Sequence, residues 1–437
     1  MNCILQHAFV VCLDDELTVL EDGAVVVQDD TIVFVGKNEE LPPTYEAFEI
    51  FDCSTALVMP SMINCHTHLG MVSFRTLGDD IADRLRRFLL PLENSCMHEQ
   101  LAVASARVAI AEMQLSGISS AVDMYFFEDA LAKVAQEMKF RLWGGETLMA
   151  EPHCSAHDGK EGLLATQKLI DTYQDNAYFT PIIAPHAPYS NTLEDLEAAH
   201  ALAKKHNLLW TMHLSEMDFE MELYREKYDQ TPIGFLASRG LLDASLLAVH
   251  CLHTSDEDLD LLSKAKTSVV HCPGANTKAA KGFARIADMR EKGIKVCLGT
   301  DGPSSGNTLD LFTQMKLYAI LQKNLKKDRT AIPAKTVVPL VTRDAAKILH
   351  AQQQIGSLEV GKKADLLILD LEAPNMIPCI DPYSLLVYSA GVQNVRHVMT
   401  NGEWVVRDHQ LKSGDLAQIR KNFYQVAQCF FKEAAML

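Results

Sequence analysis

The stretch that decides the fold is an apolar run ending in two histidines, Leu57-Val58-Met59-Pro60-Ser61-Met62-Ile63-Asn64-Cys65-His66-Thr67-His68. A short apolar run of this kind is typical of a strand that is buried on both faces. His66 and His68 are two positions apart, so on a strand both side chains point to the same face. The run therefore predicts a buried strand whose carboxyl end presents two imidazoles together.

Seven further apolar runs follow along the chain, and amphipathic helical patterns lie between most of them. This alternation favours parallel strands that are connected by helices. Eight runs match the eight strands of a (β/α)8 barrel, an α/β fold of the TIM-barrel type. The further runs are 118–125, 141–147, 179–184, 208–213, 245–250, 267–271 and 294–300, and the clearest helical patterns are 101–115, 193–206, 256–264 and 283–292.

The two ends of the chain differ from its middle, because their apolar runs are short and broken by turns. Neither residues 1–57 nor residues 355–412 contain enough strands to bury a core alone. We therefore expect the ends to pair into one small β-sandwich domain, with the barrel between them at residues 58–354. The C-terminal part, residues 355–437, also contains a final helix that we expect over 416–434.

The composition disfavours several classes of protein. Its 437 residues include 40 basic and 57 acidic side chains, and the net charge of −17 disfavours nucleic acid as a partner. No apolar run reaches the ~18 residues of a membrane span, and the first basic residue, Lys37, comes too late for a typical targeting segment. Eleven cysteines without a CxxC pair indicate reduced thiols. We expect a cytoplasmic protein that binds a small molecule, and assembly into a homo-oligomer stays open.

Polar residues gather at the predicted carboxyl ends of the strands, where barrels of this kind have their active sites. Buried imidazoles and carboxylates need partners, so core packing does not explain a group of them. His66 and His68, with His213 and Asp301 from other strand ends, would form a metal site that keeps one position open for water. Other strand ends present His186, Glu216, His250 and His271.

These motifs resemble the amidohydrolase superfamily and, within it, the methylthioadenosine/S-adenosylhomocysteine deaminases and related aminohydrolases. The resemblance covers essentially the whole chain and rests on four segments, 60–68, 213–216, 299–302 and 356–366. Proteins of this family have a barrel and a β domain divided between the chain ends. The resemblance implies a divalent metal ion, zinc or alternatively iron, bound by His66, His68, His213 and Asp301.

The number of metal ions depends on the fourth strand. In binuclear relatives, a carboxylated lysine at the end of that strand bridges two ions. Here the strand end is Ala184-Pro185-His186-Ala187-Pro188, and the nearest downstream lysine, Lys204, falls inside a predicted helix. We therefore expect one ion.

The resemblance also implies catalytic roles. A divalent ion lowers the pKa of bound water, so hydroxide becomes available near neutral pH. Asp301 would hold the proton of that water, Glu216 would pass a proton to a ring nitrogen, and His250 would orient the attacking water. The expected enzyme is a hydrolase of carbon–nitrogen bonds in cyclic amidines, which releases ammonia.

Substrate contacts follow from the same resemblance. Glu93 and His186 correspond to groups that contact the ribose in nucleoside deaminases, and Glu216 and Asp301 would also face the substrate. Two supporting residues are expected near the site. Ser305 would steady Asp301, and His271 would shape the pocket from behind.

Two positions depart from the family pattern. Glu146 stands where the family has an arginine in the substrate pocket, and Arg84 stands where it has a tryptophan beside the base or ribose. An acid in place of a base, and a cation in place of an aromatic ring, should change what the pocket accepts. We therefore expect both residues to contact the substrate.

Three hypotheses remain open. The first is an aminohydrolase that acts on an adenine nucleoside such as methylthioadenosine, S-adenosylhomocysteine or adenosine. The second is a deaminase or chlorohydrolase of another amino-heteroaromatic compound, such as a pterin, an oxidised guanine or a triazine, because the attack on the ring carbon is the same. The third is an inactive barrel that serves as an assembly protein, which the complete set of candidate ligands disfavours.

Overall fold

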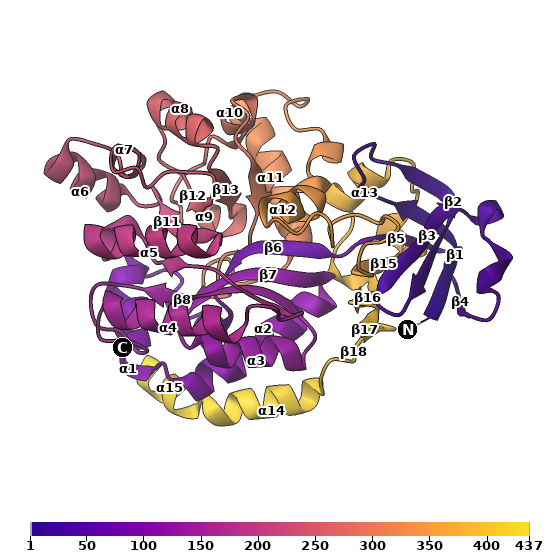
Figure 1. Ribbon diagram of the computed structural model, residues 1–437, viewed down its shortest axis with the longest axis horizontal. Helices are drawn as coiled ribbons and strands as arrows, with labels where there is room; N and C mark the ends of the chain where they lie inside the picture. Colours follow the sequence, from indigo (N-terminus) through magenta and orange to yellow (C-terminus); the bar gives the residue numbers. More distant parts are fainter. Residues whose placement is uncertain (1, 437) are drawn as a thin grey trace.

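The structure is a computed structural model that describes residues 2–436. Figure 1 shows a large body of strands and helices with a smaller group of strands at one side. Strands from both ends of the chain lie in this smaller group, and the last two helices run back along the larger body (Figure 1).

Strands from both ends of the chain form one sheet of nine strands within the described residues. This single sheet stands in the place of the predicted β-sandwich. Its central strand β5 (Ala56–Pro60) pairs antiparallel with β15 (Leu366–Asp370) and parallel with β1 (Asn2–Val11). The N-terminal strands therefore need the C-terminal strands as partners. The other members are β2 (Val19–Gln28), β3 (Thr31–Lys37), β4 (Glu49–Asp52), β16 (Val395–Thr400), β17 (Glu403–Arg407) and β18 (Gln410–Leu411).

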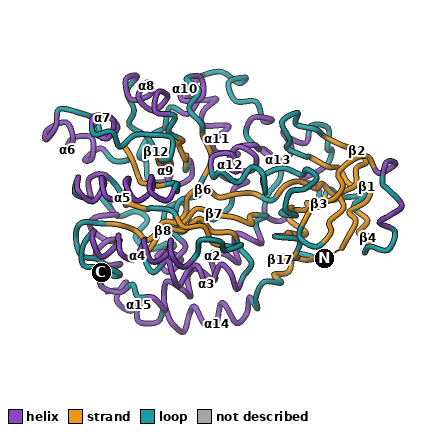
Figure 2. Tube along the Cα trace, in the orientation of Figure 1, coloured by secondary structure: helices purple, strands orange, loops and turns teal. Residues whose placement is uncertain are grey.

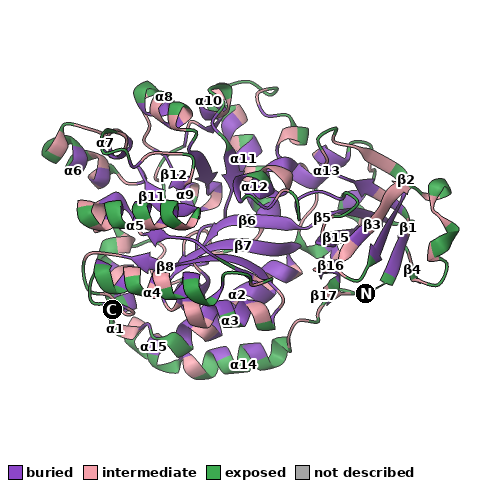
Figure 3. Ribbon diagram, in the orientation of Figure 1, coloured by how far each residue is buried: buried purple, intermediate pink, exposed green. Residues whose placement is uncertain are grey.

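The middle of the chain contains two parallel sheets, as an α/β fold requires. Each strand pairs parallel with its neighbours in the sheet, and the strands are buried (Figure 3). The first sheet contains β6 (Met62–Thr67), β7 (Ile118–Tyr125), β8 (Arg141–Leu148), β9 (Phe179–Pro181) and β10 (Ala184–Pro185), and the second contains β11 (Trp210–Leu214), β12 (Leu246–His250), β13 (Ser268–His271) and β14 (Val296–Leu298).

Backbone hydrogen bonds join the two parallel sheets at both of their outer strands. On one side, Thr211 N donates to the carbonyl of Ile183 at 2.8 Å. On the other side, Asp301 N donates to the carbonyl of His66 at 3.0 Å. These contacts bring the carboxyl ends of β6, β11 and β14 around one centre.

Three predicted elements are divided in the structure, and one of them is the run 179–184, which forms β9 and β10. The first apolar run is not one strand, because β5 ends at Pro60 in the terminal sheet and β6 begins at Met62 in a parallel sheet. Both strands are buried, so the apolar pattern gives no sign of the division. The final helix is also two helices, α14 (Leu416–Val426) and α15 (Gln428–Ala434), which meet at Ala427.

Helices cover the outer faces of the parallel sheets (Figure 2). Two of them begin at capping boxes, α5 (Leu193–His206) and α8 (Asp256–Ala265). None of the helices in residues 2–436 is both long and apolar enough to cross a membrane. The others are α1 (Leu90–Cys96), α2 (Glu99–Leu115), α3 (Glu128–Glu137), α4 (Gly159–Thr172), α6 (Asp218–Tyr228), α7 (Pro232–Ser238), α9 (Pro273–Lys278), α10 (Ile286–Glu291), α11 (Leu311–Lys326), α12 (Arg343–Ile348) and α13 (Pro382–Tyr388).

A buried ion pair connects the terminal sheet to the first parallel sheet. Arg141, at the start of β8, donates from Nε to Asp365 Oδ2 at 2.6 Å, and the two side chains are only 9% and 2% exposed. Asn401 N donates to the other oxygen, Asp365 Oδ1, at 2.7 Å. Removing one partner would leave the other charge buried and unpaired.

We predict that Asp365→Ala lowers the free energy of unfolding by ~3–5 kcal/mol, because Arg141 would lose its counter-charge away from water. Urea unfolding followed by circular dichroism measures this change. The matched control is Asp260→Ala, which removes an exposed ion pair with Lys292 and should cost less than ~1 kcal/mol. Equal losses in the two variants would contradict the role assigned to the buried pair.

Candidate metal centre and active site

Three histidines and one carboxylate meet at the carboxyl ends of β6, β11 and β14. His66 Nε2 lies 3.2 Å from His213 Nε2, and His68 Nε2 lies 3.3 Å from Asp301 Oδ1. One nitrogen atom of each histidine lies within 4.8 Å of the corresponding atoms of the other two. The structure thus brings together the four residues predicted as metal ligands, in a site that is almost fully buried.

Backbone carbonyls orient two of the imidazoles. His68 Nδ1 donates to the carbonyl of Met124 at 2.6 Å, and His213 Nδ1 donates to the carbonyl of His186 at 2.8 Å. Because a carbonyl oxygen can only accept, each Nδ1 carries the hydrogen and each Nε2 faces the centre. Metal-binding histidines are commonly fixed in this way.

The charges at the centre also suit a metal. Burial holds the pKa of His66 and of His213 well below the usual range, and the neighbouring imidazoles add to this effect. Burial alone would raise the pKa of Asp301, but the hydrogen bond and charge of His68 hold it well below its usual range. Against the effect of burial, Asp301 raises the pKa of His68 to about 9, so this ring holds a proton that a divalent ion would displace. Neutral His66 and His213 and an ionised Asp301 are already in the forms that bind a divalent ion.

His66 supplies the test of whether a cation fits. Its Nδ1 is buried and has no hydrogen-bond partner among residues 2–436. Within those residues, this atom has no partner whichever ring nitrogen carries the hydrogen. With the hydrogen on Nδ1, the Nε2 lone pairs of His66 and His213 face each other at 3.2 Å, a conflict that only a hydrogen or a cation between them relieves. A cation bound by both Nε2 atoms removes the conflict, and nitrogen and carboxylate ligands are those of a zinc site.

The strand ends around the centre are strained. Ser215, His250, Cys251 and Asp301 have φ angles of 50°, 74°, 46° and 61°, in the left-handed region. Such conformations cost about 1–3 kcal/mol each in residues other than glycine, and they cluster at functional sites. Hydrogen bonds hold them in place, for example from Cys251 N to the carbonyl of Leu214 at 3.1 Å.

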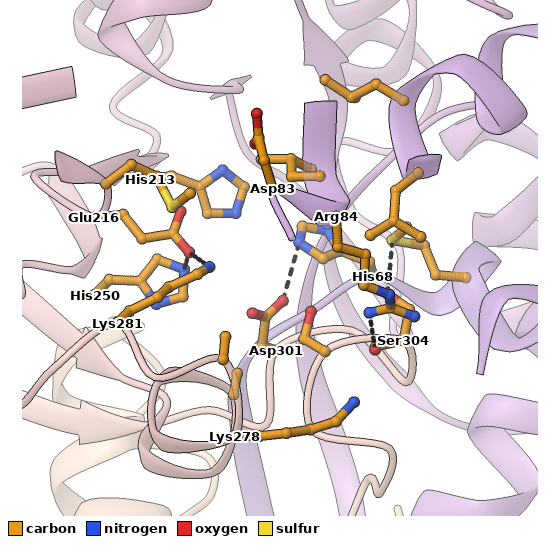
Figure 4. Close-up of a pocket in the computed structure, with 18 of the residues that line it drawn as sticks. His68, Asp83, Arg84, His213, Glu216, His250, Lys278, Lys281, Asp301 and Ser304 are labelled. Carbon is orange, nitrogen blue, oxygen red and sulfur yellow. Dashed lines mark hydrogen bonds and ion pairs between the residues drawn. The ribbon is translucent and has the colours of Figure 1, made fainter. Parts of the chain in front are cut away.

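Glu216 lies beside the centre with two cationic or polar neighbours (Figure 4). Its Oε1 accepts a hydrogen bond from Lys281 Nζ and lies 3.4 Å from His250 Nε2. On the other side of the ring, His250 Nδ1 lies 2.9 Å from Asn276 Oδ1. Burial would raise the pKa of Glu216, but His250 and Lys281 hold it below its usual value, so this side chain is a carboxylate.

Two residues outside the predicted site position Glu216. Lys281 follows α9 and lies in no recognised motif. Glu220 accepts from the backbone N–H groups of Ser215 and Glu216 at 3.0 and 2.9 Å and fixes the turn between them. Only Glu220 has a signal in the sequence. It lies four residues after Glu216, a spacing at which a carboxylate can accept hydrogen bonds from the preceding turn.

These groups line one cavity of about 530 Å³, within the range of small-molecule sites. The centre lies at its inner end, and residues of the segment before α1 form part of its wall. Of the predicted site residues, the lining includes His68, Arg84, Glu93, His186, His213, Glu216, His250, Asp301 and Ser305.

The two residues expected at the ribose are both held in place. Glu93 accepts a hydrogen bond from Tyr125 Oη at 2.5 Å, and burial raises its pKa to about 7. His186 Nδ1 lies 2.9 Å from Ser190 Oγ, and burial lowers its pKa to about 4. Each keeps a second polar atom that a substrate hydroxyl can reach.

Comparison with known proteins agrees with this geometry. Residues 57–405 match the model of the amidohydrolase family. This chain belongs to the amidohydrolase family. It is 34% identical over 426 residues to a 5-methylthioadenosine/S-adenosylhomocysteine deaminase of Thermoanaerobacter pseudethanolicus, with 97% of each chain covered.

Solved structures give a similar result. A zinc-bound adenosine deaminase from Xanthomonas campestris superposes with a TM-score of 0.94 at 30% identity, over 99% of each chain. A zinc-bound atrazine chlorohydrolase from Arthrobacter aurescens superposes with a TM-score of 0.90 at 20% identity, over 97% of this chain and 99% of that one. At 20% identity, the similarity to the chlorohydrolase shows a shared fold only.

Glu146 of this amidohydrolase is not where the sequence analysis expected it. Its carboxylate accepts from the backbone N–H groups of Phe127 and Glu128 at 3.1 and 2.9 Å and from Ser155 Oγ at 2.6 Å. Thr147 lines the cavity and Glu146 does not, because neighbouring residues of a strand point to opposite faces. The structure therefore assigns Glu146 to the start of α3 and corrects its expected substrate contact.

Arg84 lines the cavity, but its guanidinium is directed at the protein. It donates to the carbonyl of Ser304 at 2.7 Å (Figure 4). It also donates to the carbonyl of Leu77 at 2.8 Å and lies 3.3 Å from Asp79 Oδ1. These contacts hold the segment before α1 against the loop that follows β14.

The two expected supporting residues lie near the site, although Ser305 does not make the contact with Asp301 that was expected of it. Ser305 lines the cavity, and its backbone N–H donates to the carbonyl of Gly302 at 2.9 Å. Asp301 Oδ1 instead accepts from Gly302 N at 2.6 Å. His271 is buried outside the cavity lining, packs near Tyr318, and has a pKa that burial lowers to about 3.

We predict that protein expressed with zinc contains about one zinc ion per chain and that His66→Ala loses most of it, because His66 joins the other ligands at the centre. Elemental analysis of dialysed protein measures the content. The matched control, His253→Ala, changes a more exposed histidine of the cavity and should retain the ion. Two tightly bound ions per chain, or full retention by His66→Ala, would contradict the assignment.

A further prediction concerns Glu146. Glu146→Gln should lower the free energy of unfolding by ~1–3 kcal/mol, because the amide leaves one buried backbone N–H without an acceptor. Urea unfolding measures this loss, with Glu151→Gln on the exposed loop as the control. A variant that kept its stability but changed its ranking of substrates would restore the pocket role expected from the sequence.

Proposed function

We propose that this amidohydrolase is a metal-dependent aminohydrolase that converts the ring amino group of an adenine nucleoside into a carbonyl and releases ammonia. The observation that carries the proposal is the pair Glu216 and His250 facing Asp301 across the histidine cluster, inside a cavity large enough for a nucleoside. The names of the similar deaminases support the substrate class.

The metal would be held by His66, His68, His213 and Asp301, and we propose a single zinc ion, with iron as the alternative. When bound, a divalent ion lowers the pKa of water toward ~7 and so supplies hydroxide at neutral pH. The single ion is supported by His186, which directly follows β10, where a bridging lysine would be needed for two ions.

The chain's own residues would then move the protons. Asp301 accepts a proton from the attacking water, and His250, fixed by Asn276, orients that water. Glu216, which is a carboxylate in this site, takes the other proton of that water and passes it to a ring nitrogen, so the adjacent carbon accepts the oxygen and becomes tetrahedral. Asp301 then gives its proton to the amino group, which leaves as ammonia, so the net reaction consumes one water and forms one ammonia.

Binding would use the groups between the centre and the cavity mouth. We propose that Glu93 and His186 hold the ribose hydroxyls, because each has a polar atom in the cavity and a fixing contact behind it. Ser305 and Arg84 would contribute by shaping the wall, and His271 by packing behind it.

We also propose an arrangement for the whole chain. The two parallel sheets would form one eight-stranded barrel, in which β9 and β10, both paired with β8, are two parts of one strand. The hydrogen bonds at both outer strands of the sheets support this arrangement. The terminal sheet would fold into a sandwich at β1, which pairs with β4 through residues 3–6 and with β5 through residues 9–10. The eleven cysteines are free thiols, which supports a location in the cytoplasm.

Ammonia release from a panel of compounds tests the function. Adenosine and methylthioadenosine should release ammonia with zinc-loaded protein, whereas guanine, pterins and aminotriazines should not. Activity on a member of the second group alone would overturn the adenine-nucleoside assignment, and no activity on any compound would favour the inactive barrel.

We predict that Glu216→Gln lowers kcat by ~10²–10⁴-fold, because glutamine keeps the shape of the side chain but cannot carry a proton. Its zinc content should stay near that of the wild type. Glu222→Gln, at an exposed position of α6, is the control and should be fully active. Full activity of Glu216→Gln would remove the proposed proton transfer.

A further inference from the structure

The positive side chains that line the cavity are already engaged by the protein. Arg84 contacts the carbonyls of Leu77 and Ser304, and Lys278 Nζ lies 2.8 Å from Asp79 Oδ1. Lys281 pairs with Glu216. Within the described chain, no lysine or arginine of the lining is left without such a partner.

Negative side chains dominate the outer part of the same cavity. Asp79, Asp80, Asp83 and Asp218 all line it. Asp79 is shared by Arg84 and Lys278, and Asp83 is paired with Arg86. Asp80 and Asp218 form no ion pair with a lysine or arginine in residues 2–436. Asp80 and Asp218 therefore give the cavity mouth negative charge that no paired lysine or arginine of the described chain balances.

The position of the reacting ring decides which part of a substrate meets these acids. The ring must reach the centre, where His66 is fully buried. With the ribose held by Glu93 and His186 as proposed, the 5′ end of the sugar would face the outer part of the cavity, which residues 79–83 line and where Asp80 and Asp83 are exposed. Apolar side chains such as Leu89, Met149 and Met217 also line the cavity, and they suit an uncharged thioether group.

We propose that the cavity selects adenine nucleosides whose 5′ substituent carries no negative charge. This inference rests on the proposed function and adds the substrate class. A carboxylate or phosphate at the 5′ end would find no free cation and would lie near Asp80 and Asp83, so it is rejected by charge. A methylthio group, or a thioether chain that ends in an ammonium, is accepted.

Three substrates that differ only at the 5′ end test the proposal. They are methylthioadenosine, S-adenosylhomocysteine and the analogue of the latter that lacks the carboxylate, 5′-deoxy-5′-(3-aminopropylthio)adenosine. The kcat/KM of zinc-loaded wild-type protein should be at least ~10-fold higher for the first and third than for S-adenosylhomocysteine. The difference should shrink with added salt, because exposed charges are screened. Equal values for S-adenosylhomocysteine and the decarboxylated analogue would overturn the proposal.

Variants that remove charges at the cavity mouth test whether these charges set the order of kcat/KM among the three substrates. Asp79→Asn frees Lys278 and Asp80→Asn removes an unpaired charge, so each should raise kcat/KM for S-adenosylhomocysteine relative to methylthioadenosine by about 3- to 10-fold. Asp80 is exposed and unpaired, so its variant remains informative if Asp79→Asn folds poorly. The control Asp260→Asn should not change the ratio. An unchanged ratio in Asp80→Asn, with wild-type ranking, would overturn the proposal.

The same measurements separate this inference from the proposed function. Deamination of all three nucleosides at similar rates would uphold the function and refute the selection by charge. If none of the three nucleosides is deaminated, the proposed function is refuted. The selection by charge is then tested by the binding of the deaminated products. Titration calorimetry should then show weaker binding of S-inosylhomocysteine than of methylthioinosine, and equal or absent binding would overturn the selection as well.

Discussion

The Nε2 atoms of His66 and His213 approach to 3.2 Å in a site that is almost fully buried, and neutral imidazoles are stable at that distance only with a proton or a cation between them. Several features of the surrounding structure hold the two histidines at this distance. The two outer strands must meet through the hydrogen bond from Asp301 N to the His66 carbonyl, and left-handed residues must end three of the strands. The terminal sheet, held to β8 by Arg141 and Asp365, closes the far side of the same framework.

The electrostatics of the cavity change from its inner end to its mouth. At the inner end, Glu216 is kept ionised by His250 and Lys281, so a negative group is available beside an array of imidazoles. At the mouth, aspartates outnumber the positive side chains, and those cations are engaged. An amidohydrolase with this distribution can hold an uncharged nucleoside by its ring and sugar, while the charge at the mouth acts on whatever the sugar carries.

The sequence was most informative where the chemistry depends on local spacing. The pair His66 and His68 follows from strand alternation, and the order of strands and helices follows from hydrophobic periodicity, so the parallel sheets and the meeting of the four candidate ligands could be expected. Features that depend on tertiary contact could not. The division at Ser61 lies inside a continuous apolar run, and Lys281 reaches Glu216 from a loop without a motif. Glu146 matches a pocket position of the family in sequence, but its side chain points to the opposite face of the strand from Thr147. The guanidinium of Arg84 donates its hydrogen bonds to backbone carbonyls of the protein. Alignment and composition do not reveal where a side chain points.

The most direct measurement of the central claim is the fate of the oxygen atom during turnover in water enriched in oxygen-18. Zinc-loaded protein with methylthioadenosine should form one ammonia per product and place one heavy oxygen on the ring carbon that carried the amino group, as mass spectrometry of the isolated product would show. Release of free adenine with its amino group intact, or a product without the heavy oxygen, would contradict hydrolytic deamination at this site.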